Sequence, residues 1–207
     1  MSTATRIRSV ATRLFAERGY GGTSVRAICS AAGANVNAVS YHFGGKKALY
    51  TNVIQGLADQ RLASAQRILG TAAGDLVEFQ TRLLLFAEET LAALLAEPEL
   101  LMILFAEFQQ GFQNCGPEAL QGLEEQNQVL ISFLQAAQDA DLLRVDVDVD
   151  IIAGALQERL NNQVIYVNTI HAQYGTSIKV PEYRRHWTRQ TIDLLLHGAA
   201  RAPAPKE

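Results

Sequence analysis

Apolar residues recur at helical spacing along most of this 207-residue chain, and this periodicity constrains its fold more than any other feature. Near the N-terminus, the order i, i+3, i+4, i+7, i+8 is followed by Ile7, Val10, Ala11, Leu14 and Phe15, as in a helix with one buried side. Further helices are expected at about 46–69, 75–97, 99–110, 117–140, 149–174 and 181–200. The chain is therefore predicted to be all-α.

One segment departs from this pattern, because valine and aspartate alternate from Val145 to Asp150 as they would in a strand. Three valines without a partner strand are weak support for a sheet. We interpret the segment as an extended linker whose last aspartates cap the helix that follows.

Two short helices are expected before residue 45. The first helix of the chain ends at Arg18-Gly19, after which Thr23 or Ser24 caps a short helix that stops at Ala31-Ala32-Gly33. A second short helix is predicted from about Asn35 to Tyr41. Two short helices around a glycine turn have the outline of a helix-turn-helix.

Charge is distributed unevenly between the two ends of the chain. The first 50 residues hold seven basic residues and one acidic residue, a net charge of +6, whereas the rest carries −9. A basic head on an acidic body suggests that the head binds a polyanion. The same cations could simply solubilise a helical surface, and charge alone leaves both interpretations open.

The stretch from residue 23 to 50, TSVRAICSAAGANVNAVSYHFGGKKALY, resembles the signature of the TetR (tetracycline-repressor) family. It matches that signature at Thr23, Ser24, Ile28, Ala32, Gly33, Tyr41, His42, Phe43, Lys46 and Leu49, and the preceding helix matches at Ala11, Leu14, Phe15, Gly19 and Tyr20. One departure is Val39-Ser40-Tyr41, where many relatives have Leu-Tyr-Arg/Trp. A phosphate contact carried over to Ser40 would therefore have a shorter reach than one carried over to Tyr41.

The resemblance implies an N-terminal three-helix helix-turn-helix DNA-binding domain at residues 1–47. It also implies a C-terminal helical-bundle domain at residues 48–200 that binds an effector and forms a homodimer. The proline-rich tail, residues 201–207, is expected to be disordered.

Base contacts in the major groove are expected from the start of the second short helix. Asn35 and Asn37 could each pair with adenine, while Val36 and Ala38 could pack against thymine methyl groups. For Asn35, capping of the helix is an equally good interpretation.

Phosphate contacts are expected from side chains on either side of that helix. These residues are Thr23, Ser24, Arg26, Ser40, Tyr41, His42 and Lys46. The alternative for Tyr41 is packing in the core against Phe43 and Leu14.

In the body, the resemblance implies an effector pocket among the middle helices. The candidate lining residues are Phe79, Phe86, Phe105, Phe108, Gln109, Phe112, Gln126 and Phe133. Together they suggest an apolar or aromatic small molecule, although any single aromatic residue at helical spacing is more often an ordinary core residue.

We therefore expect a repressor that small-molecule binding releases from a palindromic operator, with activation as the alternative outcome. No catalytic motif, metal-ligand spacing or cofactor motif is recognisable, so an enzyme is not expected. No apolar run approaches the ~20 residues of a membrane span, and two widely separated cysteines favour the cytoplasm. The rival hypothesis is a helical protein that binds a protein partner.

Overall fold

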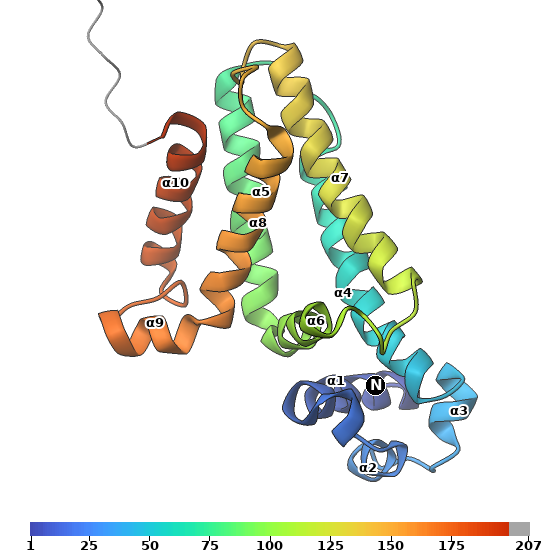
Figure 1. Ribbon diagram of the computed structural model, residues 1–207. Coiled ribbons are helices and arrows are strands. Elements are labelled where there is room, and N and C mark those ends of the chain that lie inside the picture. The colour runs from blue at the N-terminus through green and yellow to red at the C-terminus, as the bar shows by residue number, and fades with distance from the viewer. Residues whose placement is uncertain (199–207) are drawn as a thin grey trace, which may run out of the picture. The chain divides into compact units, whose positions relative to one another are not determined.

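The computed structural model describes residues 1–198, and all regular elements in this part of the chain are helices (Figure 1). The helices are α1 (Thr3–Gly22), α2 (Val25–Ala31), α3 (Ala38–Phe43), α4 (Lys46–Leu69), α5 (Leu76–Ala96), α6 (Pro98–Gln110), α7 (Glu118–Asp139), α8 (Val149–Ile165), α9 (Val167–Tyr174) and α10 (Pro181–His197). The all-α prediction is confirmed. The tail at residues 201–207 and the last two residues of the expected final helix lie outside the described residues.

The chain forms two compact units, each built from two separate stretches of sequence. The first comprises Met1–Arg67 and Ala92–Val129, and the second comprises Ile68–Leu91 with the described residues from Leu130 onward. The first unit therefore reaches well past residue 47 and includes α6 and most of α7.

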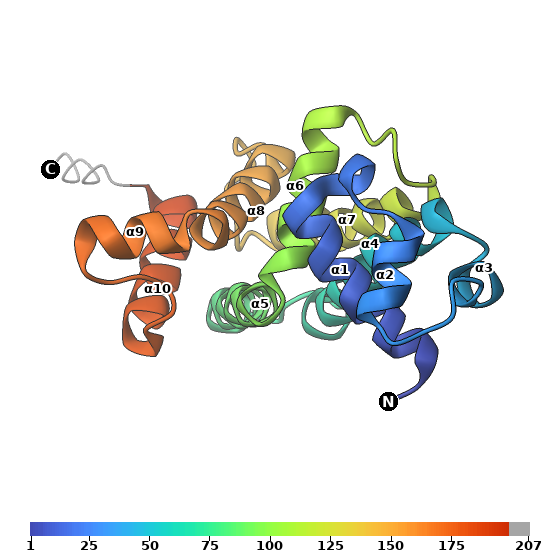
Figure 2. The same ribbon diagram turned by 90° about the horizontal axis from the view of Figure 1, so that it is seen from below.

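The first unit has one continuous apolar core. Helices α1 and α6 lie against each other in both views (Figure 1 and Figure 2). Most of the apolar side of α1 predicted from the sequence is buried, since Ile7, Ala11, Leu14 and Phe15 are all in this core. The other helices of the unit contribute Ile28, Cys29, Val39, Leu49, Tyr50, Val53, Ile54, Leu57, Leu100, Ile103, Leu104, Cys115 and Ala119.

In the second unit, α10 packs beside α8. The Arg159 side chain on α8 donates a hydrogen bond to Thr191 Oγ1 on α10 at 3.4 Å. The helix expected at 149–174 is in fact two helices, because the backbone leaves helical geometry at Tyr166 (φ −99°, ψ 14°). Helix α9 then turns away from α8 (Figure 1).

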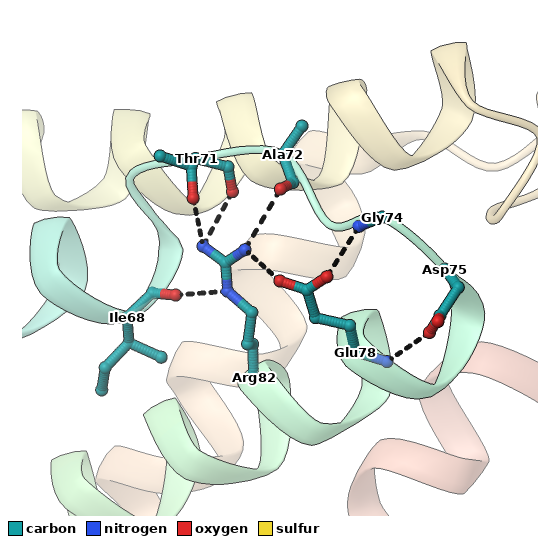
Figure 3. A network of polar contacts seen from close by, with 7 residues as sticks. All are labelled: Ile68, Thr71, Ala72, Gly74, Asp75, Glu78 and Arg82. Carbon is teal, nitrogen blue, oxygen red and sulfur yellow. Dashed lines mark hydrogen bonds and ion pairs between the residues drawn. The ribbon is translucent and has the colours of Figure 1, made fainter.

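The corner between α4 and α5 is held by one arginine (Figure 3). Arg82 on α5 donates hydrogen bonds to the backbone carbonyls of Ile68, Thr71 and Ala72, at 2.6, 2.8 and 3.2 Å. It also donates to Thr71 Oγ1 and to Glu78 Oε1. Because the last carbonyls of a helix have no partner within the helix, the guanidinium acts as a side-chain cap for the end of α4.

The valine–aspartate segment is a linker, as the sequence predicted. Asp148 caps α8, since its carboxylate accepts hydrogen bonds from the N–H groups of Asp150 and Ile151 at 2.9 and 3.2 Å. The side-chain amide of Gln138 on α7 donates to the carbonyls of Arg144 and Val147, at 2.8 and 2.7 Å. These contacts replace the strand pairing that the alternation resembled.

Candidate nucleic-acid interface

The start of α2 is fixed by two neighbouring hydroxyl residues with different roles. Ser24 is exposed and is the cap, because its Oγ accepts a hydrogen bond from the N–H of Ala27 at 3.1 Å. Thr23 is only 1% exposed, and its hydroxyl lies near the carbonyls of Leu14 and Gly19, at 3.0 and 2.9 Å. The expected phosphate contact through the Thr23 side chain does not fit this position, since the hydroxyl is turned into the protein.

Helix α3 begins later than the sequence predicted. It starts at Ala38 rather than Asn35, because the Asn35 side chain accepts a hydrogen bond from the N–H of Asn37 at 2.9 Å and forms a turn. The Asn35 side-chain oxygen thus acts as a cap, as one of the two interpretations expected, but it caps the turn that precedes α3 and not the helix itself. Asn37 is exposed and makes no capping hydrogen bond with its side chain.

The inner side of α3 anchors it to the rest of the head. Val39 is completely buried, and the half-buried Phe43 packs against the same core. The thiol of Cys29 on α2 lies 3.7 Å from the carbonyl of Val36. Gly44 ends the helix in the left-handed conformation (φ 82°), which glycine adopts without steric cost.

The outer side of the same segment is polar and open. Tyr41 is 84% exposed, so the alternative of core packing for this residue is wrong. We call residues 35–42 the recognition segment; the exposed members are Asn35, Val36, Asn37, Ser40, Tyr41 and His42, while Ala38 is half-buried. The segment therefore presents a row of amide, hydroxyl and imidazole groups on a backbone that is fixed from behind.

Basic residues flank the recognition segment in the sequence. Arg26 on α2 is exposed. Lys46 at the start of α4 is half-buried, and its Nζ lies 4.1 Å from the centre of the Tyr20 ring. This cation–π contact restricts the lysine and identifies Tyr20 as a residue that positions it.

The residues expected around an effector fall into both compact units. In the second unit, Phe79, Phe86 and Phe133 are buried, and the rings of Phe79 and Phe133 lie 5.4 Å apart. In the first unit, Phe108 and Gln109 are exposed, Phe105 and Phe112 are half-buried, and Gln126 is buried. Phe108 and Phe112 contact each other edge to face at 4.9 Å.

A buried polar network around Glu107 was not predicted from the sequence. The Glu107 carboxylate on α6 is 1% exposed and accepts a hydrogen bond from the Tyr50 hydroxyl at 2.8 Å. Burial, and then the hydrogen bond to Glu107, raise the pKa of Tyr50, so the tyrosine remains the donor at neutral pH. The available signal was a single acidic residue on the buried side of an otherwise apolar helix.

The described part of the chain contains neither a cluster of metal-ligating side chains nor a helix suited to span a membrane. No group of histidine, cysteine and acidic side chains that could hold a metal ion occurs there. None of the helices described is both long and apolar enough to cross a bilayer.

Residues 7–53 match the model of the family described as bacterial regulatory proteins, tetR family. This N-terminal part of the chain is a TetR-family domain. The match covers α1, α2, α3 and the start of α4, which together contain the recognition segment. The protein is accordingly a DNA-binding regulator of transcription. No curated protein matches its sequence.

Solved structures of similar fold extend over nearly the whole chain. PfmR, a TetR family transcriptional regulator from Thermus thermophilus, is 24% identical with a TM-score of 0.73, over 98% of this chain and 100% of that one. The fatty acid degradation regulator FadR from Bacillus halodurans is 16% identical with a TM-score of 0.73, over 98% of both chains. FadR from Bacillus subtilis, in complex with stearoyl-CoA, is 15% identical with a TM-score of 0.70, over 95% of this chain and 99% of that one. At these identities the similarity establishes the fold.

Proposed function

We propose that this TetR-family protein is a repressor that binds a palindromic operator as a homodimer and is released by a small-molecule effector. Residues 1–47 would read the DNA, and the remaining helices would bind the effector and the second copy. The observation that carries the DNA-binding part is the exposed polar row of the recognition segment, held from behind by the buried Val39.

Within that row, base reading is assigned to Asn37, because its side chain is exposed and makes no capping hydrogen bond. An asparagine amide can form two hydrogen bonds with adenine in the major groove. Val36 and Ala38 would contact thymine methyl groups. The Asn35 oxygen is already used in the turn, which leaves its amide nitrogen as the group available to DNA.

Phosphate contacts are assigned to side chains that can donate from the edges of the recognition segment. Ser40, Tyr41 and His42 are exposed at its end, and Ser24 and Arg26 are exposed at the start of α2. Lys46 would add a cation that Tyr20 holds in place. Such contacts position a protein on DNA without selecting sequence.

Homodimerisation is assigned to the helices of the second unit. Among the residues there with large exposed apolar surface, Ile151, Tyr166, Tyr174 and Leu194 lie on or beside α8, α9 and α10. By contrast, Leu156, Leu160, Val164 and Ile192 are buried within a single chain and serve its own core. Sedimentation of the Ile151→Asp/Leu194→Asp variant should show a larger fraction of monomer, and an unchanged distribution would contradict this assignment.

Effector release follows from linkage. A small molecule that binds better to a form unable to span both half-sites must weaken DNA binding by the same factor. In a symmetric dimer the half-sites lie about one helical turn apart, ~34 Å. The aromatic residues assigned above favour an apolar or aromatic effector. The stearoyl-CoA found in FadR from Bacillus subtilis makes an acyl-CoA the first probe.

The test of DNA reading is selection of tight-binding duplexes from random DNA, followed by affinity measurements at two salt concentrations. Asn37→Ala should lose or change base selectivity, because it removes the amide that reads adenine. Tyr41→Phe should bind more weakly with the same selectivity. Gln121→Ala, which removes an exposed amide on α7, is the matched control and should behave as wild type.

Wild-type affinity should fall by about 10³-fold between 50 and 200 mM salt if roughly six phosphates are contacted. An inverted repeat should be enriched. Failure of wild type to enrich any sequence would contradict operator binding. Unchanged selectivity of Asn37→Ala would contradict the role given to that residue.

The effector is tested separately on the selected operator. Stearoyl-CoA should reduce operator affinity, whereas coenzyme A without the acyl chain should not, because the apolar part is what the buried aromatic residues would recognise. Equal release by both compounds would contradict an apolar effector.

A further inference from the structure

Glu107 is a buried carboxylate, and its donors in the described part of the chain are neutral groups. Besides the Tyr50 hydroxyl, it accepts hydrogen bonds from the backbone N–H and the side-chain amide of Asn114, at 3.2 and 2.9 Å. An ionised carboxylate in an apolar core is stable only when its oxygens are hydrogen-bonded. Loss of these donors would therefore leave buried carboxyl oxygens without hydrogen-bond partners.

The donors come from two elements that are far apart in sequence. Tyr50 lies near the start of α4, and Asn114 lies in residues 111–116, which we call the α6–α7 loop. The next residue of α4, Thr51, accepts a hydrogen bond from the N–H of Gly116 at 2.9 Å. Two consecutive residues of α4 thus hold the loop, one through Glu107 and the other directly.

The loop also contains a strained residue. Phe112 has a positive φ of 57°, a conformation that is unfavourable for a residue with a side chain. Its backbone N–H donates to the carbonyl of Glu107 at 3.0 Å. The hydrogen bonds around Glu107 hold this conformation against the strain, so the loop has a built-in tendency to open when they are lost.

The other side of Tyr50 faces the DNA-binding head. Its ring packs edge to face against Phe15 at 4.7 Å and against Tyr20 at 5.0 Å. Tyr20 in turn lies under Lys46. A continuous set of contacts within the first unit therefore connects the α6–α7 loop to the end of α1 and the start of α4.

We propose that Glu107 is a positioning residue for DNA binding: it latches the α6–α7 loop onto the start of α4 and thereby fixes the head in the form that binds DNA. This inference rests on the proposed function. The latch has two states, because the carboxylate either has its Tyr50 and Asn114 donors or must be hydrated. By linkage, DNA binding closes the latch, and opening of the loop weakens DNA binding.

The test combines DNA affinity with hydrogen exchange of the loop amides in the full-length protein. Tyr50→Phe removes the donor from α4 and keeps the ring, and Asn114→Ala removes the side-chain donor from the loop. Tyr183→Phe is the matched control, since it removes a hydroxyl on α10, in the other compact unit, and also keeps the ring. Thermal unfolding of each variant verifies that it is folded at the assay temperature.

In wild type, DNA should slow exchange of the amides of residues 111–116. Tyr50→Phe and Asn114→Ala should each weaken operator binding, with a loss of about tenfold, and should abolish this DNA-dependent slowing. The operator affinity of the Tyr50→Phe/Asn114→Ala double variant should be no lower than that of the single variant that binds less tightly, because both changes open the same latch. Tyr183→Phe should retain wild-type affinity and slowing.

If Glu107 only stabilised the fold, Tyr50→Phe and Asn114→Ala would lower the unfolding temperature, but DNA would still slow exchange of the loop amides. That result overturns the proposal. Wild-type affinity of Asn114→Ala also overturns it, including when Tyr50→Phe fails to fold. These outcomes all require a wild-type protein that binds DNA. Absence of operator binding by wild type instead refutes the proposed function itself, and the inference with it.

Discussion

The partly buried side chain of Arg82 should contribute strongly to the stability of the second unit. Its side chain is 15% exposed, and it donates to the carbonyl of the buried Ile68 at 2.6 Å. A hydrogen bond from a charged group to a sheltered acceptor contributes about 1.5–3 kcal/mol. The carbonyls of Thr71 and Ala72 are exposed, so water can replace the guanidinium there and they add little.

Arg82 also lies over the ring of Phe133, 4.8 Å from its centre, and this contact adds about 0.5–1 kcal/mol. Together the two contributions amount to about 2–4 kcal/mol. Arg82→Met removes the guanidinium and keeps the aliphatic part of the side chain. At an m-value of roughly 2 kcal/mol/M, it should lower the urea midpoint of the second unit by about 1–2 M.

The matched control is Arg144→Met. Arg144 is also paired with a carboxylate, that of Asp146, but both side chains are largely exposed, so the change should leave the urea midpoint where it is. Arg82→Lys should recover less than half of the loss, because one ammonium group cannot reach acceptors on both sides of the corner. A wild-type midpoint for Arg82→Met, or equal losses for Arg82→Met and Arg144→Met, would refute the reasoning.

Three further predictions concern other local features. Thr23→Val should destabilise the protein by about 1–3 kcal/mol in urea unfolding, because it removes a buried hydroxyl positioned against two backbone carbonyls of α1; a smaller effect would mean that the hydroxyl is hydrated. Gly44→Ala should lower the free energy of unfolding by about 1–2 kcal/mol, because Gly44 has a φ of 82°. Gly154→Ala, in open space on α8, should raise it by about 0.5–1 kcal/mol. Shifts of the same sign in thermal unfolding would contradict the backbone argument. Burial, and then the charge of Glu107, raise the pKa of Cys115 above its ordinary value of 9.0. The unfolded chain therefore releases this proton first, and stability falls as pH rises past about 9. Cys115→Ser should show a shallower loss between pH 8 and 10 in urea titrations, and an identical slope would exclude the thiol as a cause.

The helices were predictable because their signals are local. The apolar spacing of α1 and the cap at Asp148 each depend on residues within a turn or two, and both predictions are confirmed. The start of α3 was misplaced because Asn35 was treated as the beginning of the helix, whereas its side chain closes a turn first. The break at Tyr166 has no glycine or proline to announce it.

Residue roles that depend on distant contacts were not predictable. Thr23 matches a polar surface pattern in the sequence, yet its hydroxyl lies against carbonyls of the preceding helix. Glu107 and Tyr50 are 57 residues apart, and nothing in a single sequence pairs them. Assignment of Asn37 and Tyr41 to DNA remains a prediction, supported by their exposure.

The shared core of the first unit has a consequence for synthesis of the protein. Residues 1–67 leave the ribosome before residues 92–129, although both stretches form one core. Helix α1 can contact α2 and α3 early, whereas its contacts with α6, the most extensive that it makes with any one helix, have to wait until α6 has been made. A nascent or truncated chain that ends at residue 67 would thus expose the part of this core that α6 and α7 complete, and chaperones bind exposed apolar surface of this kind. The core that supports the helix-turn-helix is therefore completed late, although the motif itself comes first in sequence.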